Sequence, residues 1–402
     1  MIKAVLLDLD DTLLLNADRT FVPNYLRLLD QFIQQRWGFA QFSDVLRRFI
    51  RTAASLRDVR LTNLALAQSI IADATGRDLS EMQPVFTEFY ADVYPKLRGC
   101  VEPVKIVPAL FENLRTQGYA VVIATNPMYP AEAIRQRIEW AGLPGDLSQY
   151  ALVTHSENMH FVKPDPAYYA EIVARVGVEP DEALMIGDSL TNDIGPASLL
   201  GLNTFCVTDD PSLEDAEGID GTGSLQDFYQ MTLQEGWSDL LRPQPPKPEA
   251  IEPQYRGNLG ALFGLLADVQ PQHWHQHPDP NEWSIMEVVC HLLWSEDAVQ
   301  RPRLERILAE DNPFLVAPPP PPGPGAQPPC DADGYHAAER FMERRQYTMR
   351  WLNQLEPEDW QRPARHSIFG PTTLLEMAHF TAQHDRLHIN QICQTLGRCK
   401  EG

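Results

Sequence analysis

No stretch of this sequence stays apolar for the roughly 20 residues that a membrane-spanning helix requires. The apolar run near the first residue is short, because Asp8, Asp10 and Asp11 interrupt it. A secretory signal peptide carries a longer uninterrupted apolar segment, so we expect none here. The pattern argues against a protein embedded in a membrane through apolar helices.

Positive charge is also scarce. The sequence has 33 lysines and arginines against 55 aspartates and glutamates, which gives a formal net charge of −22 at pH 7. A protein that binds nucleic acid needs a positive face that releases counterions from the phosphate backbone. Anionic membrane surfaces attract basic segments for a similar electrostatic reason. We therefore expect neither nucleic acid nor a membrane as a partner.

Cysteine is infrequent, and its spacing shows no framework. No two of the six cysteines form a Cys-x-x-Cys pair; they are Cys100, Cys206, Cys290, Cys330, Cys393 and Cys399. A disulfide-stabilised secreted scaffold would show denser and more regular spacing. We expect reduced, mostly buried thiols and a cytoplasmic location.

The residues that are abundant are typical of a globular protein with more than one domain. Apolar residues make up 44% and charged residues 22% of the chain. A length of 402 residues suggests two or three domains, each able to bury its own core. Residues 241–253 are proline-rich and polar, and we interpret them as a semi-rigid linker between domains 1–240 and 254–402.

The first chemical signal is segment 2–15, where an apolar run leads directly into acidic residues. Residues 2–7 are mostly apolar with β-branched members, which is typical of a parallel strand buried on both faces. Ligands of an open α/β sheet bind beyond the carboxyl ends of its strands. At such an end, Asp8 and Asp10 can share a divalent cation and leave one oxygen free to attack. The alternative is a strand followed by an ordinary acidic turn.

Residues 16 to about 104 predict an all-helical insertion. Apolar residues recur at three- and four-residue spacing in the four segments 23–37, 39–50, 61–75 and 80–94. The insertion directly follows the acidic end of the first strand, which suits a lid that closes over that end. A helical subdomain with a purely structural role is the alternative.

Helical and strand patterns then alternate as far as residue 207. We expect strands at 119–124, 152–154, 183–186 and 203–207. The helices expected around and between them are 108–117, 131–141, 167–176 and 194–200. This alternation predicts an α/β fold with a doubly wound parallel sheet.

Polar side chains stand near the points where these parallel strands would bring their carboxyl ends together. Besides the first two aspartates, they are Thr125, Asn126, Lys163, Asp188 and Asp193. This inventory suits phosphoryl transfer, which needs one carboxylate as nucleophile and a second as acid and base. A hydroxyl and an ammonium would hold the phosphate oxygens, and further carboxylates would hold Mg²⁺. The cation would offset the repulsion among the carboxylates.

Taken together, these motifs resemble those of the haloacid dehalogenase-like hydrolase superfamily with a helical cap. The four motifs of that superfamily correspond in order to residues 8–12, 125–126, 163–164 and 187–193. The resemblance implies that Asp8 forms an aspartyl-phosphate, and that Asp10 protonates the leaving oxygen and then activates water. It also implies binding residues, namely Thr125, Asn126 and Lys163 for phosphate, and Asp8, the Asp10 carbonyl, Asp188 and Asp193 for Mg²⁺.

Asp10 separates two branches of that superfamily. The dehalogenase branch lacks a carboxylate at this position. We therefore expect a Mg²⁺-dependent phosphatase acting on a small phosphorylated metabolite, in preference to an enzyme that cleaves carbon–halogen bonds.

The second domain has a helical pattern with few strand signals. We expect helices at 259–269, 284–310, 335–355 and 373–396, which predicts an all-α four-helix bundle. Ser284 with Glu287 and Thr373 with Glu376 have the spacing of capping boxes, and Pro302 should kink or split the second helix. Residues 317–329 are nearly all proline and glycine, which favours an exposed loop of polyproline character, either a spacer or a ligand for a proline-binding partner.

Three histidines carry the chemical signal of this domain. His384 and His388 are four residues apart, so they project from one face of the last helix. His291 lies in an apolar stretch of the second helix. Three imidazoles directed into a bundle suit a divalent metal with an open coordination position. The alternative is that each histidine is hydrogen-bonded in the core or lies at the surface.

The second domain resembles the DinB-like four-helix bundle superfamily. The resemblance rests on Trp283-Ser284, on residues 289–292 and on residues 384–392. It implies a divalent metal, zinc or nickel, held by His291, His384 and His388. His379 falls outside the four-residue spacing and is not included. Two alternatives stay open for the bundle. One is a thiol-dependent transferase. The other is a non-catalytic module for binding or dimerisation, and dimerisation would give a homodimer.

Overall fold

The computed structural model describes residues 1–16, 18–55, 58–213, 216–241, 244–326 and 329–401. The chain forms two compact units, which are Met1–Tyr169 with Pro180–Gln244 and Ala170–Glu179 with Pro245–Gly402. Residues 242–243 of the expected linker and residues 327–328 of the expected proline-rich loop lie outside the described residues. None of the described helices is both long and apolar enough to cross a membrane.

A parallel sheet forms the centre of the first unit. Its six strands within the described residues have the order β5-β4-β1-β6-β7-β8. The strands are β1 (Ala4–Leu7), β4 (Ala120–Ile123), β5 (Leu152–Val153), β6 (Ala183–Gly187), β7 (Asn203–Val207) and β8 (Gly221–Gly223). All four residues of β1 are buried, as expected for a parallel strand covered on both faces. The expected doubly wound sheet is confirmed. Strand β8 was not predicted, because its sequence Gly-Thr-Gly has no apolar pattern.

The strand order places the acidic motif at a change of direction in the sheet. From β1 the chain proceeds outward through β4 to β5, and it then returns to the other side of β1 with β6. Ligands of open α/β sheets bind at such a switch point. The helices of this part of the chain are α5 (Val107–Thr116), α6 (Ala131–Trp140), α7 (Pro166–Val176), α8 (Gly195–Leu200) and α9 (Leu225–Thr232). Residues of α7 from Ala170 onward belong to the second compact unit.

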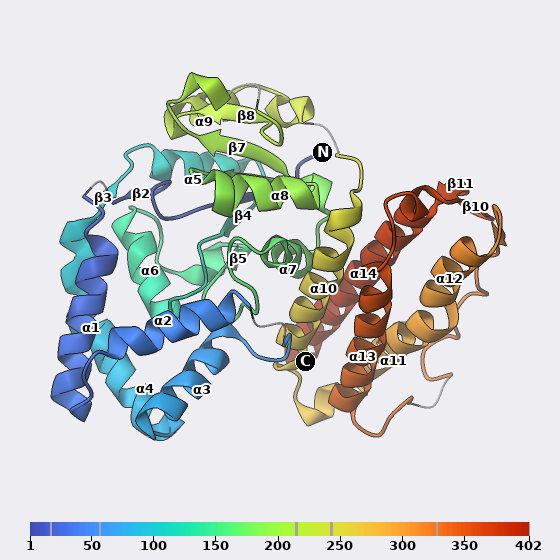
Figure 1. The fold of residues 1–402 in the computed structure, drawn as a ribbon, viewed down its shortest axis with the longest axis horizontal. Coiled ribbons are helices and arrows are strands. Elements are labelled where there is room, and N and C mark those ends of the chain that lie inside the picture. Colours follow the sequence, from blue (N-terminus) through green and yellow to red (C-terminus); the bar gives the residue numbers. More distant parts are fainter. Residues whose placement is uncertain (17, 56–57, 214–215, 242–243, 327–328, 402) are drawn as a thin grey trace. The chain divides into compact units, whose positions relative to one another are not determined.

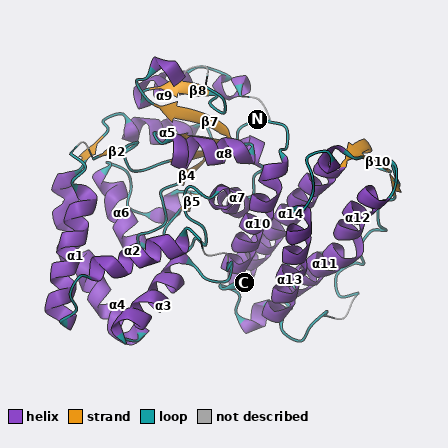
Figure 2. Ribbon diagram, in the orientation of Figure 1, coloured by secondary structure: helices purple, strands orange, loops and turns teal. Residues whose placement is uncertain are grey.

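The expected helical insertion is present and forms a cap of its own. It consists of α1 (Phe21–Trp37), α2 (Phe42–Ala53), α3 (Asn63–Thr75) and α4 (Leu79–Glu88), followed by irregular helical turns to Cys100. The short strands β2 (Leu14–Leu15) and β3 (Glu102–Pro103) pair antiparallel, so the two connections to the cap run side by side. Figure 2 shows this helix-only region apart from the strands of the sheet. Its role as a lid stays a prediction.

Local capping explains where the cap helices begin and end. Asp78 and Glu81 form a reciprocal capping box at the start of α4, and the Thr62 side chain accepts a hydrogen bond from the Ala65 amide at the start of α3. Gly38 and Gly76 end α1 and α3 in the left-handed conformation that favours glycine.

The second unit is a bundle of helices, as expected (Figure 1). Its helices are α10 (Ile251–Leu266), α11 (Ile285–Ser295), α12 (Arg301–Ala309), α13 (Gly334–Leu352) and α14 (Leu374–Glu401). Helix α10 packs against α14, and α11 packs against both α13 and α14. The first helix begins at Ile251, eight residues before the start that periodicity suggested, because Pro253 is tolerated in its first turn.

Proline splits the second helix of the bundle, as its position suggested. Helix α11 ends at Ser295, residues Glu296–Gln300 form a π-helical turn, and α12 begins at Arg301 with Pro302 in its first turn. Proline has no backbone N–H to donate, and the π-helical turn before it accommodates this break in the helical hydrogen-bond pattern. The capping box of Ser284 and Glu287 is present at the start of α11. A small sheet of β9 (Phe314–Leu315), β10 (Pro363–His366) and β11 (Gly370–Thr373) was not foreseen.

One expectation about the cysteines is wrong. Cys290 and Cys330 form a disulfide, with their Cα atoms 5.5 Å apart, so these thiols are not both free and reduced. The sequence separation of 40 residues hides this pairing, because only the folded loop brings the two residues together. Cys100, Cys206, Cys393 and Cys399 are free thiols, and Cys393 is exposed.

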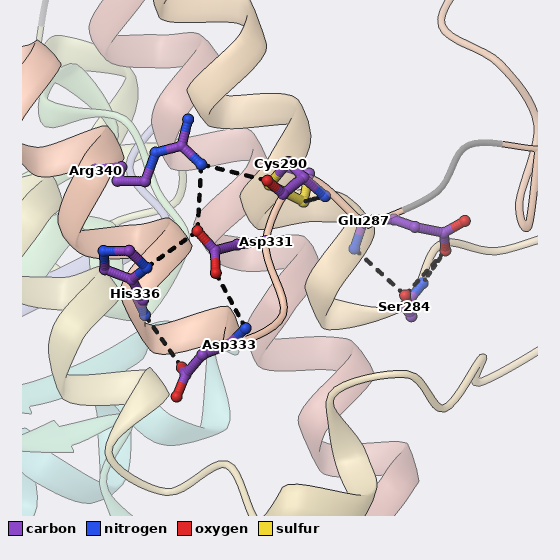
Figure 3. The surroundings of a disulfide bond; sticks show 8 residues. Ser284, Glu287, Cys290, Asp331, Asp333, His336 and Arg340 are labelled. Atoms are coloured by element: carbon purple, nitrogen blue, oxygen red, sulfur yellow. Dashed lines mark hydrogen bonds and ion pairs between the residues drawn. A yellow bond between two sulfur atoms is a disulfide. The ribbon is translucent and has the colours of Figure 1, made fainter.

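The loop that ends at Cys330 is attached to the bundle at several points (Figure 3). The Gly325 amide donates to Glu287 Oε1 at 2.6 Å, and Arg340 Nη1 donates to the Cys330 carbonyl at 3.3 Å. Asp331 forms ion pairs with both Arg340 and His336. The disulfide is therefore one of several contacts that hold the proline-rich loop against α11 and α13.

Candidate active site and candidate metal centre

Strand register brings the first acidic motif next to two other motifs. Leu7 pairs with Ile123 of β4 on one side and with Ile186 of β6 on the other. The Asp8 amide donates to the Ile186 carbonyl at 2.9 Å, and the Ala124 amide donates to the Leu7 carbonyl at 2.8 Å. The residues that directly follow β1, β4 and β6 therefore share one edge of the sheet.

Lys163 joins two of the expected site residues. Its Nζ donates to Asp8 Oδ1 at 2.6 Å and to Asp193 Oδ1 at 2.5 Å, and all three side chains are buried. Lys163 comes from the loop before α7, and Asp193 comes from the helical turn after β6. Residues that are far apart in the sequence therefore meet around one ammonium group.

Three carboxylates form a compact cluster at this edge. One oxygen from each of Asp8, Asp188 and Asp193 lies within 4.8 Å of the others. Thr12 Oγ1 donates to Asp188 Oδ1 at 3.4 Å. Gly187 leaves the necessary space, because a Cβ at that position would lie 2.5 Å from Asp193 Cγ. Hard oxygen donors at this spacing suit Mg²⁺.

The electrostatics of the cluster call for a cation. The pKa of Asp8 is raised to about 7, because burial and the charges of Asp193 and Asp188 raise it more than Lys163 lowers it. Burial also raises the pKa of Asp188, with a further contribution from the Asp193 charge. Three carboxylates face one ammonium, so a divalent cation would supply the missing positive charge.

Thr125 and Asn126 lie where they were expected, directly after β4. Thr125 is buried, and its carbonyl accepts hydrogen bonds from Thr154 Oγ1 at 2.6 Å and Tyr168 Oη at 2.8 Å. The Asn126 Oδ1 atom is buried and lacks a hydrogen-bond partner within the described ranges. The hydroxyls of Thr154 and Tyr168 thus fix the backbone at Thr125.

Asp10 has a partner that sequence reasoning missed. Its side chain is 46% exposed and forms an ion pair with Nη2 of Arg137, a residue of α6 that is 1% exposed. Burial lowers the pKa of Arg137 to about 10, and the charge of Asp8 opposes this effect. The sequence did contain a signal for the burial of Arg137, because it lies four and three residues after the buried Ala133 and Ile134.

The three expected histidines of the bundle meet. One ring nitrogen from each of His291, His384 and His388 lies within 4.8 Å of the others. Nε2 of His291 and Nε2 of His384 are 3.2 Å apart. Two ligand nitrogens bound to one tetrahedral zinc would be about 3.3 Å apart, given Zn–N bonds of about 2.0–2.1 Å. The described geometry therefore fits a shared metal ion.

The surroundings of the histidines favour neutral imidazoles. Burial and, to a smaller extent, the two other imidazoles lower the pKa of His291 to about 3. Burial and His384 lower the pKa of His388 to about 4. His388 Nδ1 lies 2.9 Å from Gln391 Oε1, so it donates there when Nε2 carries the lone pair. Neutral imidazoles with oriented lone pairs are the form that binds metal.

A cavity of about 280 Å³ opens beside His291. Its lining includes Trp283 and Trp294, with Cys290 of the disulfide and prolines 319–322 of the loop. The Trp283 ring lies parallel to the His388 ring, with centroids 6.1 Å apart. The proline-rich loop therefore forms one wall of the approach to the histidine cluster.

The fold and the clusters define two known classes of protein in one chain. Residues 2–201 match the family model of the haloacid dehalogenase-like hydrolases, and residues 254–392 match that of the DinB superfamily. The chain is therefore a haloacid dehalogenase-like hydrolase in its first part and a member of the DinB superfamily in its second part.

Curated relatives match the first part of the chain. Phosphoglycolate phosphatase from Rhodospirillum rubrum is 26% identical over 232 residues, which cover 58% of this chain and 90% of that protein. Phosphoglycolate phosphatase from Mesorhizobium japonicum is 28% identical, over 50% of this chain and 81% of that protein. Pyrophosphatase PpaX from Bacillus cereus is 26% identical, over 52% of this chain and 83% of that protein.

Proposed function

We propose that the first unit is a Mg²⁺-dependent phosphatase that hydrolyses a small phosphomonoester through an aspartyl-phosphate on Asp8. The observation that carries this proposal is the cluster of Asp8, Asp188 and Asp193 around Lys163 at the switch point of the sheet. The named activities of the relatives support it, since both phosphoglycolate phosphatase and pyrophosphatase release phosphate from small anionic molecules.

In the first half-reaction, a carboxylate oxygen of Asp8 attacks phosphorus, and the bond from phosphorus to the leaving oxygen breaks. Asp10 gives its proton to that leaving oxygen. Lys163, 2.6 Å from Asp8 Oδ1, orients the nucleophile, and its ammonium with the Thr125 hydroxyl would hold the phosphoryl oxygens.

In the second half-reaction, water attacks the phosphorus of the aspartyl-phosphate. Asp10 now accepts the water proton, Asp8 is regenerated and inorganic phosphate leaves. Asp8, the Asp10 carbonyl and Asp188 would hold Mg²⁺, with Asp193 as a helper. When bound, the ion supplies charge stabilisation for the phosphoryl group.

Replacing Asp8 by asparagine tests the nucleophile. We expect Asp8→Asn to lower the rate of p-nitrophenyl phosphate hydrolysis by at least about 1,000-fold, because the amide cannot attack phosphorus. A matched control is Asp44→Asn, which changes an exposed carboxylate of the cap. EDTA should abolish wild-type activity and added Mg²⁺ should restore it. An Asp8→Asn variant as active as the control would refute the proposed chemistry.

For the second unit, we propose a divalent metal site formed by His291, His384 and His388. The spacing of the three ring nitrogens and the lowered pKa values of His291 and His388 support it. Nitrogen ligands favour zinc or nickel over Mg²⁺. The cavity beside His291 would give a small molecule access to a metal ion held by the three histidines.

Elemental analysis of the purified protein tests this metal site. We expect about one zinc or nickel per chain in the wild type and less than a tenth of that after His384→Ala combined with His388→Ala. His336→Ala combined with His275→Ala is the control, because it removes two imidazoles outside the cluster. Equal metal content in both double variants would contradict the site.

Two alternatives for the bundle give different outcomes. A thiol-dependent transferase would consume a small thiol in a reaction that requires His291. A non-catalytic module would consume none, and a dimerisation module would give a homodimer in sedimentation experiments. The cavity beside the histidines favours the transferase over the module.

We further propose that the protein is cytoplasmic. Its proposed partners are small phosphorylated metabolites and a second copy of the chain. The net charge of −22 supports the absence of nucleic acid and anionic membranes as partners. The disulfide is the observation that opposes a reducing compartment. Thiol trapping of Cys290 and Cys330 in fractionated cells tests the location.

A further inference from the structure

The burial of Arg137 in the candidate active site is not explained by the proposed phosphatase mechanism. It is 1% exposed, and its Nε and Nη1 atoms have no hydrogen-bond partner in the described part of the chain. Its guanidinium carbon lies 5.0 Å from the Phe21 ring centroid and 5.3 Å from that of Tyr129. Buried polar atoms are nearly always paired, so two unpaired nitrogens on one buried cation require an explanation.

A structural ion pair with Asp10 does not provide that explanation. Only Nη2 contacts Asp10, whose carboxylate is 46% exposed and therefore well solvated. Neighbouring Arg135 shows what a structural arginine of the same helix looks like, because it is at the surface and pairs with both Glu132 and Glu139. Burial of a cation costs free energy unless anions and hydrogen bonds compensate it. Arg137 lacks most of that compensation.

The position of Arg137 points to the leaving-group side of the site. It contacts Asp10, the residue proposed to protonate the leaving oxygen, and it interacts electrostatically with Asp8. Lys163 contacts Asp8 and Asp193 instead. The two cations therefore divide the site, with Lys163 beside the transferred phosphoryl group and Arg137 beside the group that leaves.

We propose that Arg137 binds a second anionic group of the substrate, attached at or next to the leaving oxygen. This inference rests on the proposed phosphatase function and narrows its substrate class. The substrate would be a phosphate ester or anhydride whose leaving part carries a carboxylate or a second phosphate. A planar guanidinium matches both groups, because it forms two parallel charge-assisted hydrogen bonds with either of them.

The same contact has a consequence for Asp10. In the ligand-free arrangement, Arg137 Nη2 pairs with the Asp10 side chain. A substrate anion that binds Arg137 competes for this guanidinium and frees the Asp10 side chain from the ion pair. Arg137 would thus select the substrate and release the Asp10 side chain only when a matching anion is bound.

Two esters of the same length test the inference in the full chain with Mg²⁺. They are 2-phosphoglycolate, which has a carboxylate next to the leaving oxygen, and 2-hydroxyethyl phosphate, which has a neutral hydroxymethyl group there. We expect wild-type kcat/KM to be about 10- to 100-fold higher for the carboxylate ester, the range expected for hydrogen bonds to a charged group. Pyrophosphate is the third substrate to be compared. If the wild type prefers it to 2-phosphoglycolate, the second anionic group of the substrate is a phosphate.

Substitution of the arginine should remove this preference. We expect Arg137→Met to bring the ratio of the two kcat/KM values close to one, and Arg137→Lys to retain part of it. Arg135→Met is the matched control on the same helix and should keep the wild-type ratio. Circular dichroism establishes that each variant is folded. A purely structural arginine would change both esters equally and leave the ratio intact.

Binding without turnover gives a second measurement. In the Asp8→Asn background, which cannot form the aspartyl-phosphate, we expect Arg137→Met to weaken 2-phosphoglycolate binding by about 10- to 100-fold in calorimetric titrations. Equal wild-type activity on both esters and pyrophosphate, or a ratio that survives Arg137→Met, overturns the inference and leaves the phosphatase intact. Absence of Asp8-dependent hydrolysis of any ester overturns the proposed function instead.

Discussion

At Asp8, burial and the proposed role as nucleophile impose opposite demands on the same side chain. Burial raises its pKa to about 7, whereas attack on phosphorus needs the ionised carboxylate. The buried ammonium of Lys163 is the described group that favours the ionised form most directly. Lys163 therefore has a structural role in addition to any contact with phosphate.

Removing that ammonium should destabilise the metal-free protein. We expect Lys163→Met to lower the free energy of unfolding by about 3–5 kcal/mol at pH 8, because Asp8 and Asp193 are left buried without their partner. The cost should shrink toward pH 5.5. There the folded protein keeps a proton on Asp8 that the unfolded chain, with a pKa near 3.8, does not bind.

Urea unfolding of Lys163→Met and wild type at the two pH values, in EDTA, measures this effect. Lys105→Met, a substitution at an exposed lysine, is the control and should change stability by less than about 0.5 kcal/mol. A destabilisation that grows as the pH falls would contradict the role assigned to Lys163.

Among the elements, the proline-rich loop is held by a covalent bond as well as by hydrogen bonds. The disulfide from α11 to Cys330 closes a segment of 40 residues that contains α12 and the loop. Its neighbour Glu287 both caps α11 and accepts the Gly325 amide. The first turn of α11, the helix that carries His291, therefore also holds the loop.

Loss of the disulfide should lower the stability of the second unit. We expect Cys330→Ser, or reduction of the wild type, to cost about 2–4 kcal/mol, because the unfolded chain regains the freedom that the cross-link removes. Thermal unfolding monitored with and without a reducing agent measures the change. Cys393→Ser removes an exposed free thiol and serves as the control. Identical melting curves for Cys330→Ser and the control would show that the cross-link does not form.

At the scale of the whole molecule, the chain holds two candidate metal sites of different chemistry. One offers three carboxylates, and the other offers three imidazoles. Oxygen ligands select Mg²⁺, whereas imidazoles bind zinc and nickel far more tightly. Each site lies within its own compact unit, so their ligands are not shared.

A nitrogen-donor chelator should therefore separate the two sites. We expect 1,10-phenanthroline to remove zinc or nickel from the protein while Mg²⁺-dependent phosphatase activity stays within about two-fold of its starting value. EDTA, which binds both classes of ion, should abolish both. Metal content by elemental analysis and hydrolysis of p-nitrophenyl phosphate are measured on the same samples. Parallel loss of activity and bundle metal would mean that the two sites depend on each other.

Much of the fold follows from local patterns in the sequence. The buried apolar run of β1 predicts its place in a parallel sheet, and the register of that sheet then predicts that Asp8 and Asp188 meet. In the bundle, the four-residue spacing of His384 and His388 sets them on one helix face. Such features depend on backbone periodicity, which a short stretch of sequence specifies by itself.

Other features exist only because the chain folds back on itself. The ion pair of Arg137 with Asp10, the cross-link of Cys290 with Cys330 and the Gly-Thr-Gly strand β8 have no local pattern of their own. Each depends on a partner distant in sequence, and pairing of that kind is decided by packing and burial. The sequence by itself determined the two folds and the residues of both clusters, whereas tertiary packing alone decided which charge lies beside Asp10 and which loop lines the cavity at His291.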